Sequence, residues 1–409
     1  MTDEVLDLIA REEKRQEETL MLIPSENYTY PEVREAVGSV LMHKYAEGYP
    51  GRRYYQGNEI VDEIEILAQK RAQTLFGVPY VNVQPYSGSP ANMAVYFALL
   101  SYGDTLMGLS LAHGGHLTHG NPVSFSGKYF KSVQYGLDDQ AENFFNFAEI
   151  RQVAQASRPK VIVVGTTAFP RRLPWKEFAE IADEVGAYLL ADISHIAGLV
   201  AGGAHSSPVP YAHLVTTTTH KTLRGPRGAI IMVTQKGLAK DSNLGKKIDK
   251  AVFPGLQGGP HLHTIAGIAV ALKKAAEPEF KEYAQQVVKN AQVLAQTLIN
   301  HGFNLVTGGT DNHLILIDLR NLNLDGQDAA IKLEEEGIIT NKNAIPNDPN
   351  PPSRPAGLRL GTPAVTARGM KEEEMKTIGE MIKGVLLENK KVHSQVSALC
   401  SRFPTTKND

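Results

Sequence analysis

Lys221 lies between a run of threonines and a Gly-Pro turn, a setting that suits covalent chemistry. The segment 216–228 reads TTTTHKTLRGPRG. A threonine-rich run favours a β-strand, so the lysine is expected at the end of a strand with its amine held in one direction. Kept neutral by burial or by nearby positive charge, such an amine can attack the aldehyde of a cofactor such as pyridoxal phosphate. An ordinary surface lysine is the alternative that this residue alone leaves open.

An acid ends a second apolar strand, 29 residues upstream of Lys221. Asp192 follows the run 188–191, YLLA. A buried carboxylate needs a positive partner, and the protonated nitrogen of a pyridine ring can supply it. That pairing also makes the ring an electron sink for carbanion chemistry. The separation leaves room for a connection and one further strand, so both side chains could reach one cleft. A structural salt bridge is the alternative for Asp192.

A phosphate site is predicted just before the apolar helical run 93–100. Ser89 fits the N-cap position and Pro90 the first helical position. The amides and hydroxyls of Ser87, Gly88 and Ser89 would then face the positive end of a helix. The segment lacks the glycine-and-lysine pattern of a nucleotide P-loop, and a plain helix cap is common. This phosphate cradle, Asp192 and Lys221 follow in that order along one chain, so together they are stronger evidence for a cofactor site than each is alone.

The elements that must position these residues alternate between strand and helix. Helices are expected at 4–20, 31–41, 62–76 and 174–182, and strands at 105–109, 160–164, 187–191, 214–219 and 229–234. This order predicts an α/β fold with a mostly parallel central sheet and helices on both faces.

A smaller C-terminal α+β domain is expected after the glycine-rich segment 254–260. A helical pattern runs over 264–300 with an interruption at Pro278, and it is followed by a strand at 314–318, a helix at 327–336 and an amphipathic pattern at 371–389. We therefore divide the chain into an N-terminal arm (1–58), a large domain (59–270) and a small domain (271–409). The arm is too short to hold a core, so we expect it to pack on a partner subunit.

Composition is typical of a cytoplasmic enzyme. A chain of 409 residues exceeds one hydrophobic core, and 42% hydrophobic residues can fill two. The formal net charge of −2 gives no general attraction to nucleic acid or to anionic membranes. Cys400 is the single cysteine, so no internal disulfide is possible. The first residues carry no signal-like apolar stretch, and no apolar run is long enough to span a bilayer.

Three histidines in a glycine-rich segment raise the question of a metal site. His113, His116 and His119 are spaced by three, which places side chains on one face only in a helix. Gly114 and Gly115 argue against a helix, and no acid cluster lies nearby. We expect no metal here.

Four longer segments carry a family resemblance. They are 44–51 (KYAEGYPG), 111–120 (LAHGGHLTHG), 216–227 (TTTTHKTLRGPR) and 357–363 (GLRLGTP). In order and spacing they resemble serine hydroxymethyltransferase, also called glycine hydroxymethyltransferase, nearly end to end. The resemblance implies fold type I of the pyridoxal-phosphate enzymes, like aspartate aminotransferase. It also implies a homodimer with shared active sites, with a tetramer as the alternative.

The implied reaction converts L-serine and tetrahydrofolate reversibly to glycine and 5,10-methylenetetrahydrofolate, through aldimine and quinonoid intermediates. Residues with an implied catalytic role are Lys221, Glu47, His116, Asp192, Tyr55 and His220. Implied contacts with pyridoxal phosphate come from Ser87, Gly88, Ser89, His116, Thr167, Asp192, His195, Thr218, Lys221 and Arg227, and, toward the neighbouring subunit, from Tyr45 and Gly259. Implied substrate contacts are Ser25, Glu47, Tyr54, Tyr55, His195 and Arg359. Implied folate contacts are Leu111, Gly115, His116, Leu117 and Asn343.

Several of these roles also have a reason in the residue itself. Arg359 lies in an apolar strand-like segment, where a guanidinium is costly without an anion, so it suits the substrate's carboxylate. A structural ion pair is the alternative. Arg227 would help to lower the pKa of Lys221. Glu47 would transfer protons near the serine hydroxyl, with a structural salt bridge as its alternative.

Three departures from the family pattern affect the expected affinity for folate rather than the binding of pyridoxal phosphate. They are 166–171 (TTAFPR), 351–353 (PPS), and Tyr86 with Pro90 beside the cradle. A folate-independent aldolase acting on threonine or allo-threonine is therefore the alternative enzyme. A non-catalytic RNA-binding or regulatory protein is disfavoured, because Lys221, Asp192 and Arg359 are all present without a basic stripe.

Overall fold

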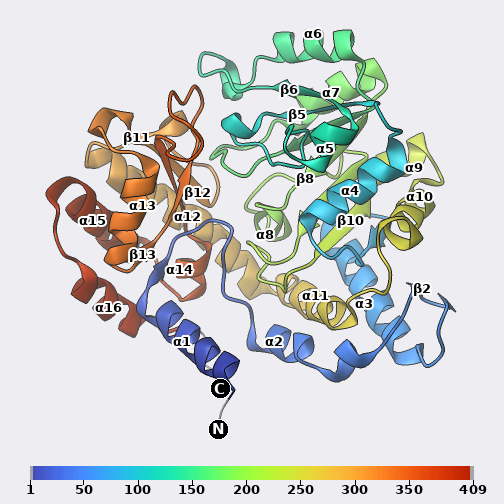
Figure 1. Ribbon diagram of the computed structural model, residues 1–409, viewed down its shortest axis with the longest axis horizontal. Helices are drawn as coiled ribbons and strands as arrows, with labels where there is room; N and C mark the ends of the chain where they lie inside the picture. Colours follow the sequence, from blue (N-terminus) through green and yellow to red (C-terminus); the bar gives the residue numbers. More distant parts are fainter. Residues whose placement is uncertain (1–2, 406–409) are drawn as a thin grey trace. The chain divides into compact units, whose positions relative to one another are not determined.

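The computed structural model describes residues 3–405, which form two compact units (Figure 1). The larger unit comprises Thr29–Thr167 and Arg172–Ala284. The smaller unit comprises Ala168–Arg171 with the described parts of Met1–Tyr28 and Gln285–Asp409. The predicted arm is thus divided after Tyr28, and the boundary expected near residue 270 lies after Ala284. Residues 1–2 and 406–409 of the predicted domains lie outside the described residues.

A seven-stranded sheet forms the centre of the larger unit. Its strands, in spatial order, are β4 (Tyr80–Asn82), β10 (Ala229–Val233), β9 (Leu214–Thr218), β8 (Tyr188–Asp192), β7 (Val161–Gly165), β5 (Thr105–Leu109) and β6 (Lys131–Tyr135). β6, β5, β7, β8 and β9 pair in parallel, whereas β10 is antiparallel to both β9 and β4. The predicted mostly parallel sheet is confirmed.

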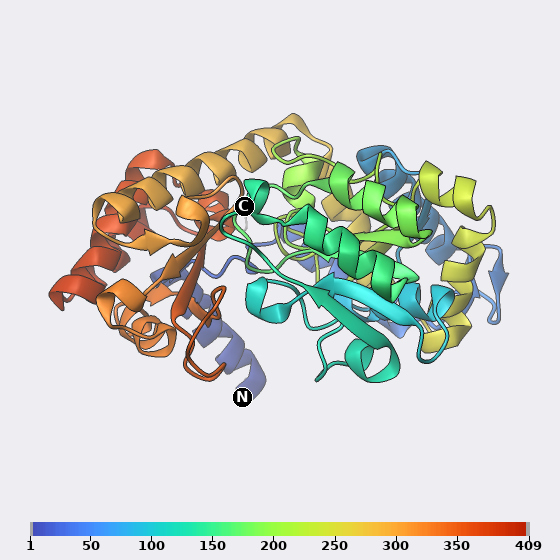
Figure 2. The ribbon, with the colours of Figure 1, turned by 90° about the horizontal axis from the view of Figure 1, so that it is seen from above.

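Helices cover both faces of this sheet, as the burial of its central strands requires (Figures 1 and 2). Every residue of β7, β9 and β10 is buried, which happens only when both faces are covered. The helices of this unit are α2 (Pro31–Val37), α3 (Glu59–Phe76), α4 (Gly88–Leu99), α5 (Phe125–Tyr129), α6 (Phe147–Ser157), α7 (Trp175–Val185), α8 (Ala197–Ala201), α9 (Gln235–Lys240), α10 (Leu244–Lys250) and α11 (Leu262–Ala275). Two short strands, β2 (Gly48–Tyr49) and β3 (Arg52–Arg53), form a separate hairpin.

The start of α4 differs from the prediction. Ser87 is the N-cap and the helix begins at Gly88, so Ser89 as the N-cap was wrong. Pro90 therefore lies inside the first turn, where a missing N–H costs nothing because those amides have no intrahelical partner. A Cβ on Gly88 would lie 2.7 Å from Thr218 Cγ2, so glycine lets the helix begin against the end of β9.

The smaller unit has a four-stranded antiparallel sheet. Its order is β11 (Asn304–Leu305), β12 (Leu314–Asp318), β15 (Gly357–Gly361) and β14 (Asn341–Asn343). The short strands β1 (Leu20–Met21) and β13 (Ile338–Ile339) pair in parallel. The helices are α1 (Glu4–Glu18), most of α12 (Pro278–Asn300), which begins in the larger unit, α13 (Gly326–Glu335), α14 (Pro363–Ala367), α15 (Glu372–Glu388) and α16 (His393–Arg402). A continuous core joins α12, α13, α15 and α16 to β12 and β15.

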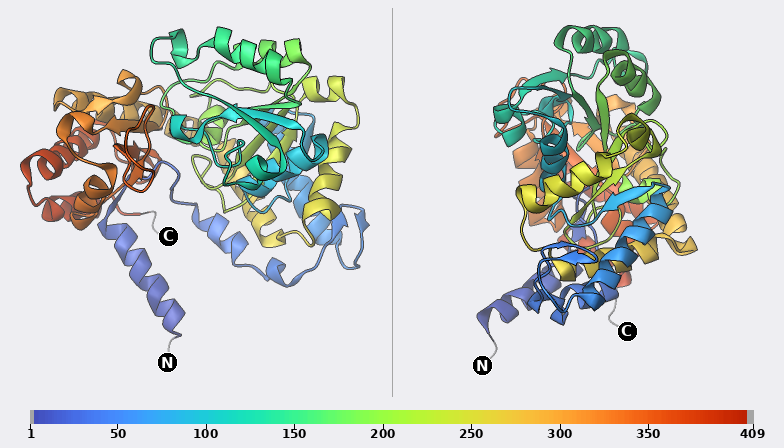
Figure 3. Two further views of the ribbon diagram at one scale, coloured as in Figure 1. Left: turned by 45° about the horizontal axis from the view of Figure 1, so that its top comes forward. Right: turned by 90° about the vertical axis from the view of Figure 1, so that its right-hand side faces the viewer.

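α1 has no buried residue and stands out from the rest of its unit (Figure 3). Its apolar side chains include Val5, Leu6, Leu8 and Ile9, each at least half exposed. Within residues 3–405, no helix is both long enough and apolar enough to cross a membrane.

Candidate active site

Asp192 is the last residue of β8 and is held by four hydrogen bonds. Asn92 Nδ2 (2.9 Å) and His119 Nε2 (3.1 Å) donate to its Oδ2. Ser194 donates to Oδ1 from its backbone N (3.0 Å) and its Oγ (2.6 Å). Burial alone would raise the pKa of this carboxyl, but the hydrogen bonds from His119 and Ser194 lower it well below its usual range. Asp192 is therefore a buried, ionised acid at the carboxyl edge of the sheet, where parallel α/β folds bind ligands.

Lys221 lies three residues beyond the end of β9 and is connected to this acid. Its Nζ donates to Thr218 Oγ1 (2.9 Å), and the backbone N of Thr218 donates to Ser194 Oγ (3.1 Å). Lys221 therefore follows a strand, as predicted. β8 and β9 are parallel neighbours, so their carboxyl ends lie at the same edge of the sheet. Lys221 as a whole is partly buried.

The N-terminus of α4 meets the same strand end, because Gly88 lies against Thr218. Ser87 and Ser89 are exposed there. The first amides of a helix, with nearby hydroxyls, suit a phosphate group. An anion site, a buried acid and an amine are therefore close together, and these groups fit pyridoxal phosphate.

The three histidines have different partners. His113 Nδ1 accepts a hydrogen bond from Leu137 N (2.8 Å), and His119 contacts Asp192. His116 Nδ1 lies 2.8 Å from Thr118 Oγ1, and burial lowers its pKa to about 4, so the ring is neutral near pH 7. Among the described residues, no group of three or more histidine, cysteine or acidic side chains is placed to hold a metal.

Other predicted residues lie on or next to the segment 111–120, which we call the histidine loop. Thr167 Oγ1 donates to Gly115 O (3.0 Å), which joins the segment after β7 to the histidine loop. Leu111 and Leu117 are exposed on the histidine loop, whereas Gly115 is buried. A Cβ on Gly115 would lie 2.0 Å from Leu109 O, which explains why glycine is needed there.

Two more histidines lie next to the acid and the lysine. His195 is 6% exposed, and its carbonyl accepts a hydrogen bond from Thr222 Oγ1 (3.1 Å). Burial, together with the charges of Lys221 and Arg227, lowers the pKa of His220 to about 3. His220 is therefore neutral near pH 7. Arg227 itself is exposed.

A second group of predicted residues lies around the β2–β3 hairpin, and we call it the arm group. It consists of Tyr45, Glu47, Tyr54 and Tyr55. The rings of Tyr45 and Tyr55 meet edge to face, with centroids 5.0 Å apart. The negative charge of Glu47 raises the pKa of Tyr55. Tyr45 and Glu47 also approach Gly259 and Gly258. Figure 1 places this hairpin at the edge of the larger unit, away from β8.

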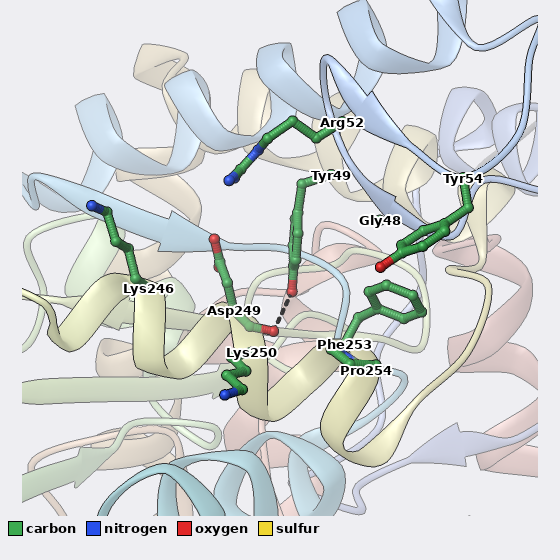
Figure 4. Close-up of a pocket in the computed structure, with 9 residues that line it drawn as sticks. All are labelled: Gly48, Tyr49, Arg52, Tyr54, Lys246, Asp249, Lys250, Phe253 and Pro254. Carbon is green, nitrogen blue, oxygen red and sulfur yellow. Dashed lines mark hydrogen bonds between the residues drawn. The ribbon is translucent and has the colours of Figure 1, made fainter.

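A pocket of about 360 Å³ is lined by residues of the hairpin and of α10 (Figure 4). Tyr49 donates from its hydroxyl to the carbonyl of Asp249 (2.7 Å) at the centre of this pocket. The ring of Tyr54 meets Phe253 edge to face at 5.7 Å, on the rim. The hairpin is thus held by Tyr49 while Tyr54 stays 72% exposed.

Arg359, Ser25 and Asn343 belong to the smaller unit. Arg359 lies in β15, and its Nε donates to Asn341 Oδ1 of the neighbouring strand β14 (3.1 Å). Burial lowers its pKa to about 10, so the guanidinium keeps its charge near pH 7. Gly361 N donates to Leu22 O (2.7 Å), which brings the segment leading to Ser25 alongside the end of β15. Asn343 Nδ2 donates to Ala344 O (2.6 Å).

The sequence interpretation missed three residues that hold Asp192. The sequence pattern predicts no role for Asn92 or Ser194, and it raises His119 only as a candidate metal ligand. Asn92 and His119 are each 1% exposed. Asn92 did carry a signal, because a polar side chain directly before the apolar run 93–100 needs a partner if the helix is buried.

Comparisons with known proteins agree with this geometry. A model of the family "Serine hydroxymethyltransferase" matches residues 1–382. A protein of Desulfotalea psychrophila named serine hydroxymethyltransferase is 54% identical over 407 residues, covering 98% of this chain and 94% of its own. One of the same name from Acidothermus cellulolyticus is 54% identical over 413 residues, covering 98% and 95%. The chain therefore belongs to the serine hydroxymethyltransferase family, whose members are fold type I enzymes that depend on pyridoxal phosphate and use tetrahydrofolate as co-substrate.

Proposed function

We propose that this chain interconverts L-serine and glycine, passing the one-carbon unit between serine and tetrahydrofolate at a site built on Lys221 and Asp192. The observation that carries the proposal is the connection from Lys221 through Thr218 and Ser194 to a buried, ionised acid. Pyridoxal phosphate, when bound, supplies an electron sink for the pair left on the α-carbon as the Cα–Cβ bond of serine breaks.

The residues of the larger unit divide the work of holding the cofactor. Lys221 would attach to its aldehyde carbon, and Asp192 would keep its ring nitrogen protonated. Ser87, Gly88 and Ser89 would bind its phosphate through amides and hydroxyls. The other side chains with a proposed cofactor role are Thr167, at the phenolic oxygen, His116 and His195, at the ring faces, and Thr218, His220 and Arg227, near the lysine.

The substrate carboxylate is assigned to Arg359. A planar guanidinium makes two parallel hydrogen bonds to a carboxylate, and its charge survives the local burial. Ser25, on the segment alongside β15, would add a hydroxyl contact. For folate, we propose the exposed Leu111 and Leu117 with Gly115, His116 and Asn343.

The arm group is proposed to complete the active site of a second copy of the chain. Tyr45, Tyr54 and Tyr55 are 54%, 72% and 44% exposed, which leaves large aromatic surface for a partner to cover. Glu47 and Tyr55 would then act on the neighbour's substrate, and Tyr45 and Gly259 would approach the neighbour's phosphate. The exposed apolar side chains of α1 also fit an inter-subunit position. A cytoplasmic homodimer is the simplest assembly with these properties.

An absorbance titration of the purified, cofactor-loaded protein tests the function. Glycine is added first and tetrahydrofolate second. A new long-wavelength band that becomes strong only when both are present supports the folate-dependent reaction. A full band with glycine alone, combined with threonine cleavage that ignores folate, would assign the chain to the aldolases instead.

A further inference from the structure

One buried amide connects the separate parts of the cofactor site. Asn92 lies one turn into α4, the helix whose first residues form the phosphate cradle, and is 1% exposed. Its Nδ2 donates to Asp192 Oδ2 and to Thr118 Oγ1, both at 2.9 Å. Its Oδ1 accepts a hydrogen bond from Thr216 Oγ1 at 2.7 Å. A single side chain thus connects α4 with the end of β8, with the middle of β9 and with the histidine loop.

The orientation of this amide follows from chemistry. An ionised carboxylate can only accept hydrogen bonds, so the side of Asn92 that faces Asp192 must carry the NH₂ group. Its carbonyl oxygen then faces Thr216, whose hydroxyl has a hydrogen to donate. Three of the four hydrogen-bonding positions of the amide are therefore used, each with a partner of the correct kind.

The same logic continues from Thr118 to His116. Because Thr118 Oγ1 accepts a hydrogen from Asn92, its own hydrogen is available for His116 Nδ1, 2.8 Å away. The backbone N of Thr118 also donates to that nitrogen, at 3.2 Å. His116 Nδ1 is thus an acceptor from two directions, so a neutral His116 ring carries its proton on Nε2.

We propose that Asn92 is a positioning residue that fixes Asp192 and, through Thr118, His116 relative to the phosphate cradle. Asp192 and His116 have their cofactor roles only if the proposed function holds, so this inference rests on it in part. The consequence is that Asp192, His116 and the phosphate cradle at the start of α4 are all positioned by the same side chain. With Nδ1 occupied as an acceptor, a neutral His116 ring has its N–H on Nε2.

Two substitutions of Asn92 separate positioning from packing. Asn92→Asp keeps the shape and an oxygen facing Thr216, but it places a second carboxylate against Asp192 and removes both N–H donors. Asn92→Ala removes the contacts and leaves a cavity. A packing role predicts the milder effect for aspartate, whereas a positioning role predicts an aspartate effect at least as large. Thr216→Val is the matched control, because it breaks a buried hydrogen bond but leaves both donations from Nδ2.

The first measurement is histidine side-chain ¹⁵N NMR of the cofactor-free protein, with His116→Gln and His119→Gln for assignment. Both rings should move in the two Asn92 variants and stay close to wild type in Thr216→Val. The second is the dissociation constant for pyridoxal 5′-phosphate, which should rise roughly tenfold or more in both Asn92 variants, since a hydrogen bond to a charged group is lost. The control should stay within about twofold of wild type.

The NMR result does not depend on catalysis, so it distinguishes a failure of this inference from a failure of the proposed function. Wild-type protein with an Nε2–H His116 but no affinity for pyridoxal phosphate would refute the function and keep the network. Unchanged histidine signals and cofactor affinity in Asn92→Asp would overturn the positioning role. So would equal losses in Thr216→Val, because they would show a general effect of fold stability.

Discussion

The environment of Asp192 and the arm group are two polar regions of the larger unit. The side chains of the first are largely buried and hydrogen-bonded within the chain, whereas the tyrosines of the second are exposed. Asn92, His119 and Asp192 are 1%, 1% and 8% exposed, and the acid receives four hydrogen bonds from within the chain. The tyrosines of the arm group are 44% to 72% exposed, and only Tyr45 and Tyr55 among them meet edge to face. The first region is complete in one chain, whereas the second presents aromatic surface and a carboxylate that a partner can use.

This difference follows from how each region is built. Parallel strands bring their carboxyl ends to one edge, so Asp192, Thr218 and the residues after them meet without any other subunit. The β2–β3 hairpin has only two residues in each strand and cannot form a core. It is held through Tyr49 and Asp249, which leaves Tyr54 and Tyr55 free to contact a neighbour.

The largest effect should come from Lys221→Ala in the buried region. Turnover of serine with tetrahydrofolate should fall by about 10²–10⁴-fold or more, because the amine that attaches the cofactor is lost. Borohydride reduction followed by peptide mapping should label Lys221 in the parent protein. Circular dichroism of the variant is the control for folding, and label on a different lysine would refute the assignment.

Mixing two inactive chains tests whether the arm group acts across subunits. Lys221→Ala and Tyr55→Ala chains should each be inactive alone. A hybrid dimer has one site with both defects and one with neither, so full exchange of equal amounts should restore about a quarter of the parental activity. Native mass spectrometry would confirm exchange. Exchange without recovery, or an active monomer in sedimentation, would contradict the shared site.

Arg359→Ala tests whether substrate binding can be separated from cofactor binding. Serine affinity should weaken by about 2–5 kcal/mol, because a charge-assisted pair with the carboxylate is lost. The cofactor absorbance should remain that of the parent protein, since the cofactor contacts proposed here lie in the larger unit. Isothermal titration with serine provides the affinity, and Arg359→Lys shows how much depends on the planar fork. Unchanged serine binding would place the carboxylate elsewhere.

Substitutions in the two regions should also differ in how much they lower the free energy of unfolding. Asp192→Ala leaves buried donors without their acceptor, so the free energy of unfolding should fall by about 1–3 kcal/mol or more. Tyr54→Ala should change it by less than about 0.5 kcal/mol, since that side chain is largely exposed. Urea unfolding of the cofactor-free protein measures both. Similar losses for the two variants would mean that the arm group is part of the folded core.

The last difference between the two regions concerns acid. His116 has a folded pKa of about 4, below its ordinary value of 6.5, so the unfolded chain takes up its proton first as the pH falls. Its contribution to stability should therefore decline from about pH 6.5 to about pH 4, by less than about 1.4 kcal/mol per pH unit. Melting temperatures over this range should show a shallower decline in His116→Gln. Tyr54→Phe, in the exposed region, should follow the parent curve.

Much of the architecture was readable in the chain itself. The apolar runs ending at Asp192 and the threonine run before Lys221 predicted two strands whose bounds agree within a residue, because strands buried on both faces must be continuously apolar or β-branched. The family segments predicted the fold type and the cofactor, and both are confirmed. The residue roles remain predictions.

Only the tertiary structure decided which polar side chains meet. Asn92 lies 100 residues from Asp192 along the chain and His119 lies 73, so no local pattern connects them to the acid. The start of α4 was also a tertiary matter, because Gly88 begins the helix two residues earlier than the serine-proline pattern suggested, where Thr218 leaves no room for a Cβ. Sequence determines strands and helices through local periodicity, whereas hydrogen-bond partners in the site depend on which strand ends the sheet brings to one edge.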